Sequence, residues 1–164
     1  MRQFLGKYND VAVSLSVLAA AKIDRLILSL STEVGFYGLV EKEEKKDKLI
    51  LVVKDILIYP QKVSNVTTIT DDLEMAEFFM DNVENINKIR YHGHSHAQMP
   101  TSPSTVDVAH MQNLVSSLKE DEFYIFQIFN KFGSLSTIVY MDGLYYSVPC
   151  YREIDQMLDY SVIS

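Results

Sequence analysis

The chain has 164 residues, of which 48% are hydrophobic and 23% charged, as in an ordinary globular protein with one sizeable core. Its formal net charge of −7 argues against broad contact with nucleic acid or anionic membranes, because both need a cationic surface. The single cysteine, Cys150, excludes an internal disulfide and a cysteine-rich zinc site, and makes a cytoplasmic location the natural expectation.

In the first half of the chain, strand and helix patterns alternate. Alternating apolar residues predict a strand over 11–15, and the apolar spacing that follows predicts an amphipathic helix over 17–30 rather than a signal peptide or membrane span. Two apolar segments, 33–40 and 49–59, predict a pair of strands. The charged run 41–48 between them is predicted to be a solvated hairpin tip.

The second half of the chain continues this mixture. Polar loops are predicted over 60–72 and 98–103. The predicted elements are a helix over 73–86 capped by Asp71 or Asp72, a strand over 88–96, a helix over 104–118, strands over 122–130, 135–140 and 144–148 with a hairpin at Asp142-Gly143, and a short helix from Tyr151. This order predicts an α/β fold (α+β type), a single domain over residues 1–164 with a mixed β-sheet flanked by helices.

Three of the four histidines lie in the segment 92–96. Alternate side chains of a strand share one face, so His92, His94 and His96 are expected to point the same way. Two such imidazoles can bind one ion, and zinc takes nitrogen ligands at about 2.0–2.1 Å. A third ligand must come from elsewhere, and Asp107 stands at the start of the next helix. A fourth position left to water would make the site catalytic rather than structural.

Each of these residues also has a simpler interpretation. A histidine cluster can be a polar surface strand, and Ser104 to Asp107 form a serviceable helix capping box. Glu33 alone is an ordinary exposed carboxylate. The aromatic residues within 123–129 and 140–146 fit sheet packing better than a binding surface.

Taken together, the residues resemble the JAMM (MPN-plus) zinc metallopeptidase motif. That motif reads His-Ser/Thr-His-Pro, seven further residues ending in Ser, two more residues, and Asp. The matching residues are His94, His96, Ser104 and Asp107. The family's upstream glutamate, at the start of a glycine-containing apolar strand, matches Glu33. The resemblance covers residues 10–148.

The motif also separates the histidines by role. It pairs the second and third histidines of the segment with Asp107, because shifting the pair back by two residues would place Thr105 at the acidic position. His92 then either hydrogen-bonds near the site or faces solvent, and solvent is favoured. His110, one helical turn after Asp107, is expected on the helix surface. Ala97 replaces the family's usual proline, which puts the rigidity of the following loop in doubt.

The resemblance implies an MPN-type domain, layered like cytidine deaminase, with one Zn²⁺ per chain bound by His94, His96 and Asp107. It implies hydrolysis of a peptide or isopeptide bond by zinc-bound water, with Glu33 moving the proton and Ser104 donating to the developing oxyanion. The implied substrate is a protein or peptide, with the C-terminal tail of a ubiquitin-like protein as one candidate. The compact chain favours a minimal prokaryotic or phage-type enzyme, and its oligomeric state is not readable.

Three alternatives stay open. The first is a non-enzymatic MPN-type scaffold, which has no need of the matching residues. The second is a zinc hydrolase for a small amide or a nucleic-acid-related substrate, of which the net charge disfavours the latter. The third is an α/β domain in which the histidine strand has no metal.

Overall fold

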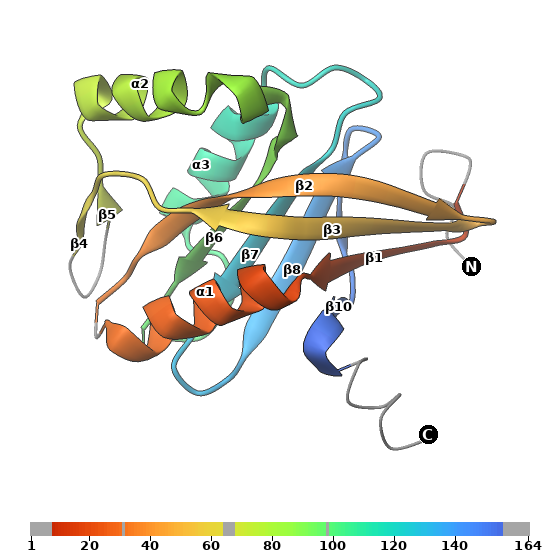
Figure 1. Ribbon diagram of the computed structural model, residues 1–164, viewed down its shortest axis with the longest axis horizontal. Coiled ribbons are helices and arrows are strands. Elements are labelled where there is room, and N and C mark those ends of the chain that lie inside the picture. The colour runs from red at the N-terminus through yellow and green to blue at the C-terminus, as the bar shows by residue number, and fades with distance from the viewer. Residues whose placement is uncertain (1–7, 31, 64–67, 98, 156–164) are drawn as a thin grey trace.

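The computed structural model describes residues 8–30, 32–63, 68–97 and 99–155. Among them, one curled, mixed sheet of eight strands has the order β10-β1-β3-β2-β6-β7-β8-β9 (Figure 1). Its strands are β1 (Asp10–Leu15), β2 (Gly35–Lys45), β3 (Lys48–Leu57), β6 (Ile89–Ser95), β7 (Tyr124–Phe129), β8 (Leu135–Met141), β9 (Leu144–Ser147) and β10 (Cys150–Arg152). The remaining elements are α1 (Val17–Ser29), α2 (Asp72–Asp81), the 3₁₀ helix η1 (Val83–Lys88), α3 (Thr105–Val115) and a small ribbon of β4 (Lys62–Val63) with β5 (Thr68–Ile69).

Helix α1 covers one face of this sheet. The side chain of Ser16 caps the helix by accepting a hydrogen bond from the Ala19 amide at 3.0 Å. The buried side of α1, which includes Ile23 and Ile27, packs into the main core with residues of β1, β2, β3 and β6. This packing explains why the amphipathic pattern forms a helix, since most helical stability in proteins comes from burying such an apolar face.

Helices α2 and α3 cover the opposite face (Figure 1). Met111 and Val115 of α3 pack on Tyr124 and Phe126 of β7. Phe78 and other apolar residues of α2 pack on an aromatic cluster at the ends of β2 and β3. The predicted mixed sheet with flanking helices is therefore confirmed. No helix within the described ranges is long and apolar enough to cross a membrane.

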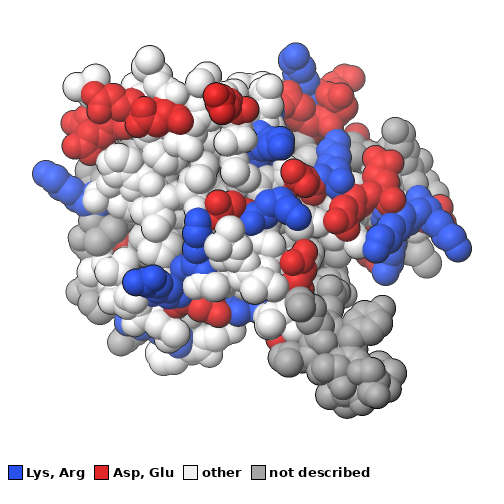
Figure 2. Space-filling model, viewed as in Figure 1, with Lys and Arg blue, Asp and Glu red and all other residues white. Residues whose placement is uncertain are grey.

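The charged run 41–48 is exposed throughout and contains the hairpin turn, as predicted. The turn itself is shorter than the run, because β2 continues through Lys45 and only Lys46 and Asp47 form it. The strand persists because residues 41–45 pair with residues 48–52 of β3, whose inward side chains belong to the core. Figure 2 shows acidic and basic side chains intermixed over the β2–β3 hairpin, and acidic side chains along α2. The face drawn there therefore has no broad basic surface.

The prediction of a helix beginning at Tyr151 is wrong for its first two residues. Residues 150–152 form β10, which pairs in parallel with β1, and only residues 153–155 are helical before the described residues end. Long-range contacts decide this outcome. The guanidinium of Arg152 donates to both carboxylate oxygens of Asp24 at 2.7 and 2.8 Å, and the buried Gln127 amide contacts the Cys150 sulfur at 3.0 Å.

Two boundaries in the α2 region also differ from prediction. Asp71 is the N-cap, but α2 ends at Asp81 and η1 follows. The Asn82 side chain donates to the carbonyl of Phe78 at 2.8 Å and so competes with continuation of the helix. The loop expected over 60–72 contains the β4–β5 ribbon, and residues 64–67 of that loop lie outside the described residues.

Candidate metal centre

Strand β6 brings the histidines to the α2–α3 face of the sheet. It lies between β2 and β7, and His92, His94 and His96 all line the same cavity, as the alternation predicts. Gly93 lies between two of them and faces the main core. A side chain there would overlap the ring of Phe36, its register partner on β2, so this glycine leaves room for that ring over β6.

Three potential ligand atoms converge at the end of β6. The Nε2 atoms of His94 and His96 are 3.0 Å apart. The Asp107 carboxylate places Oδ1 3.1 Å from the first and Oδ2 2.9 Å from the second. Ligand atoms at about 2.0–2.1 Å from a tetrahedral zinc lie about 3.3 Å apart, so the observed spacing fits one ion with little adjustment.

The hydrogen bonding of His96 sharpens this fit. Its Nδ1 atom lies 2.7 Å from the carbonyl oxygen of Pro100, which can only accept, so Nδ1 carries a hydrogen. In the neutral ring, Nε2 therefore presents a lone pair to the Asp107 carboxylate. A lone pair facing a carboxylate needs a cation or a second proton between them. Carbonyl contacts of this kind commonly orient metal-binding histidines.

Asp107 is both a capping residue and a member of the triad. The Ser104 side chain accepts from the Asp107 amide at 3.1 Å, and the Ser104 amide donates to Asp107 Oδ2 at 2.8 Å, which is the predicted capping box. Burial alone would raise the pKa of Asp107, but hydrogen bonding and charge from His94, with the Ser104 bonds, hold it well below its usual range. The carboxylate is thus kept ionised, as a metal ligand requires.

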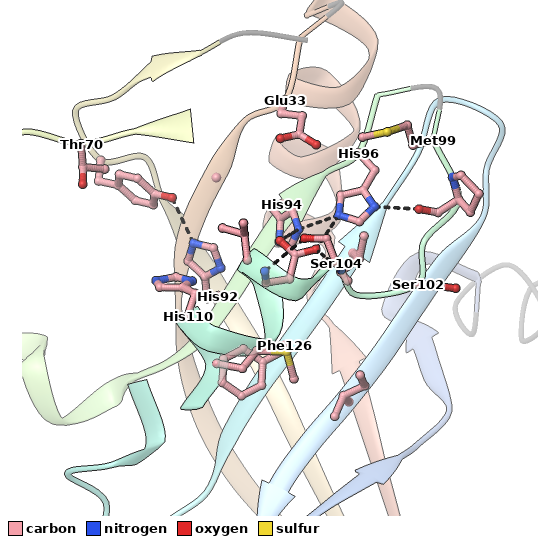
Figure 3. A pocket seen from close by; sticks show the side chains of 18 residues that line it. Glu33, Thr70, His92, His94, His96, Met99, Ser102, Ser104, His110 and Phe126 are labelled. Carbon is pink, nitrogen blue, oxygen red and sulfur yellow. Dashed lines mark hydrogen bonds and ion pairs between the residues drawn. The ribbon is translucent and has the colours of Figure 1, made fainter. Parts of the chain in front are cut away.

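Glu33 lies just before β2 and lines the same cavity. Its residue is only 8% exposed, and its carboxylate points toward the histidine pair (Figure 3). The Ser95 amide donates to the Val34 carbonyl at 2.9 Å, which ties the chain beside Glu33 to the end of β6. Burial raises the pKa of Glu33, the two imidazoles oppose this, and the charge of Asp107 adds to it. A buried carboxylate of raised pKa beside a potential metal site is suited to proton transfer.

The chain matches neither a protein-family model nor a curated protein. All five predicted site residues line one cavity, and His94, His96 and Asp107 form a group that could hold a metal ion. Glu33 joins that group from the segment before β2, and Ser104 from the N-cap of α3, three residues before Asp107.

The favoured expectation for His92, that it faces solvent, is wrong. His92 is only 6% exposed, and its Nε2 lies 3.0 Å from the hydroxyl of Tyr59. Burial, followed by the neighbouring His110 and His94, holds the pKa of His92 well below its ordinary value, so the ring is neutral. The cause is tertiary packing. The rings of Tyr37 and Tyr59 contact the His92 ring, and α2 packs on these two tyrosines.

His110 also differs from its expected place on the helix surface. Its ring meets the His92 ring edge-on with centroids 4.7 Å apart, and it lines the cavity. It is not one of the three converging ligands. Sequence reasoning missed Tyr59 altogether, because its contact with His92 joins residues 33 positions apart.

Backbone hydrogen bonds fix the exit from β6. Ala97 has φ of 53°, in the left-handed region, where proline cannot go. The Ala97 amide donates to the Ser95 side chain at 3.0 Å, and the Ala97 carbonyl accepts from Lys131 at 2.8 Å. The His96 amide also donates to the Phe129 carbonyl at 2.8 Å. The loop is therefore held here without the proline of the motif.

Proposed function

We propose that this chain is a zinc-dependent hydrolase of the JAMM (MPN-plus) type, which cleaves a peptide or isopeptide bond. The observation that carries the proposal is the convergence of His94 Nε2, His96 Nε2 and the Asp107 carboxylate, beside the buried Glu33. A curled mixed sheet with helices on both faces is compatible with the MPN-type, cytidine-deaminase-like layering that the motif implies.

In this proposal the metal, Glu33 and Ser104 each have a separate chemical role. Bound zinc supplies Lewis acidity and lowers the pKa of a coordinated water to about 7. Glu33 takes a proton from the attacking water and passes it to the leaving amine, a kind of help that contributes roughly 10²–10⁴-fold. The Ser104 oxygen accepts from the Asp107 amide, so its hydroxyl hydrogen can donate to the developing oxyanion.

The cavity favours an amide substrate over an anionic one. It has a volume of about 760 Å³, and no Lys or Arg is among the described residues that line it. Phosphate-bearing substrates are usually held by such cations. A protein or peptide substrate fits better, with a ubiquitin-like tail as one candidate and a small amide as the alternative.

A non-enzymatic scaffold explains the site less well. A scaffold needs neither three converging ligand atoms nor a carboxylate buried beside them. Burying Glu33 costs free energy, and that cost is understandable where the group takes part in proton transfer.

Substitution of Glu33 tests the proposed function. We expect Glu33→Gln to retain one zinc per chain and to lose at least about 10²-fold in cleavage rate, because the amide cannot accept the proton. The assay uses ubiquitin-like fusions and unstructured peptides as substrates. Glu77→Gln, on the exposed side of α2, is the control and should match the wild type. Cleavage by Glu33→Gln at the wild-type rate would contradict the proposed role.

A further inference from the structure

Beside His94, His96 and Asp107, the cavity is lined by apolar side chains of β7 and β8, which we call its floor. Register places Ile128 of β7 directly beside His94, and Phe126 beside His92. On the next strand, Ile138 of β8 lies beside Phe126. All these side chains share one face of the sheet, so the polar histidine row is continued by an apolar floor.

Helix α3 lies above this floor and contributes further apolar side chains to the cavity. Met111 packs on Phe126 and lines the cavity, and Val106 lies at its rim, 74% exposed. Ile138 is only partly buried, although it belongs to the same apolar group. Ile128, Phe126 and Met111 form the bottom of this part of the cavity and are only 2%, 4% and 8% exposed, so an apolar side chain entering here would mainly cover Ile138 and Val106.

The floor lies at the distance of a substrate side chain from the reacting position. Neighbouring strands are about 4.8 Å apart, so Ile128 is one strand spacing from His94, and Ile138 lies about 10 Å from β6. Ile138 is in register with Phe126 and His92 rather than with His94. A residue that flanks a bond held over His94 and Asp107 therefore meets Ile128 first, and only a long apolar side chain extends toward Ile138. A glycine at that place in the substrate would leave the floor unfilled.

We infer that Ile128, Ile138, Phe126 and Met111 form a subsite for a bulky apolar side chain, such as that of leucine or methionine, flanking the scissile bond. The inference rests on the proposed function and narrows its substrate class. It makes these residues determinants of specificity, separate from the residues that bind metal or move protons.

Two hydroxamates provide the first test. Acetohydroxamate can reach a zinc ion but not the floor, whereas 4-methylpentanohydroxamate carries a branched chain that can reach both. We expect calorimetry on the zinc-loaded chain to give at least about tenfold tighter binding of the branched probe, because burial of its extra carbons is favourable. In Ile138→Asn this preference should fall to threefold or less, with acetohydroxamate binding unchanged. Leu144→Asn, at an exposed site on β9, is the control and should keep the preference.

A second measurement does not depend on zinc. In isoleucine-methyl NMR spectra of the metal-free chain, N-acetyl-leucinamide should shift the Ile128 and Ile138 signals, and N-acetyl-glycinamide should not. Ile23 and Ile125, buried in the other core layer, should stay unchanged. Zinc binding without these shifts, or equal affinity for both hydroxamates, would overturn the subsite. Leucinamide shifts in a chain that binds no zinc would support the subsite and overturn the proposed function instead.

Discussion

The hydroxyl group of Tyr59 occupies the space that a side chain on Gly35 would fill. Gly35 lies opposite His94 in the β2–β6 pair, and Tyr59 reaches across it to the Nε2 of His92. Gln61 fixes the glycine by bonding both its amide and its carbonyl, each at 2.7 Å. The position of Tyr59 beside the cavity therefore requires a glycine at position 35.

Gly35→Ala should destabilise the fold by about 1–3 kcal/mol, because the new methyl group displaces Tyr59 and breaks its bond to His92. Urea denaturation of single and double variants measures the effect. In a Tyr59→Phe background the cost of Gly35→Ala should be smaller, since the overlapping hydroxyl is gone. Equal costs in both backgrounds would show that the two residues are not coupled.

Much of the site could be predicted because its signals are local. The capping box of Ser104 and Asp107 needs only a three-residue spacing, and the structure contains it. The Asp142-Gly143 hairpin is also confirmed, with φ of 55° and 74° as a tight turn between strands requires. That His94 and His96 share one face follows from strand alternation, whereas the choice of this pair with Asp107 is implied by the motif that they resemble.

Other features could not be predicted because they depend on distant partners. Burial of His92 needs Tyr59 and α2, which no local pattern connects to β6. Strand β10 exists because it pairs with β1, almost the whole chain away, and its three residues are too few to predict a strand from their pattern alone. The left-handed Ala97 is likewise set by its bonds to Ser95 and Lys131 rather than by its residue type.

Ser104 has two roles that substitution can separate. Ser104→Gly should cost only a few tenths of a kcal/mol in stability, because glycine is a tolerated N-cap, yet it removes the hydroxyl. We expect it to keep zinc and to lose about 10²–10³-fold in cleavage rate. Ser104→Thr retains cap and hydroxyl and should remain active. If the Gly variant cleaved as fast as the wild type, Ser104 would be a capping residue only.

The presence of Ala97 where the motif has proline leads to a prediction about stability. Restoring the motif with Ala97→Pro should destabilise the chain by about 3 kcal/mol or more, because proline cannot adopt a positive φ and lacks the amide that bonds Ser95. Ala97→Gly should stay within about 1 kcal/mol of the wild type, since glycine accepts this conformation freely. Thermal unfolding compares the three chains. A Pro variant as stable as the wild type would mean that the loop has another conformation.

The most direct measurement is the zinc content of the purified chain and of three variants, by elemental analysis after dialysis. We predict one zinc per chain for the wild type and for His110→Ala, whose ring lines the cavity outside the ligand group. His96→Ala and Asp107→Ala should bind no stoichiometric zinc, because two remaining ligands do not hold the ion. A wild-type chain without zinc, or an Asp107→Ala chain that retains it in full, would contradict the metal site.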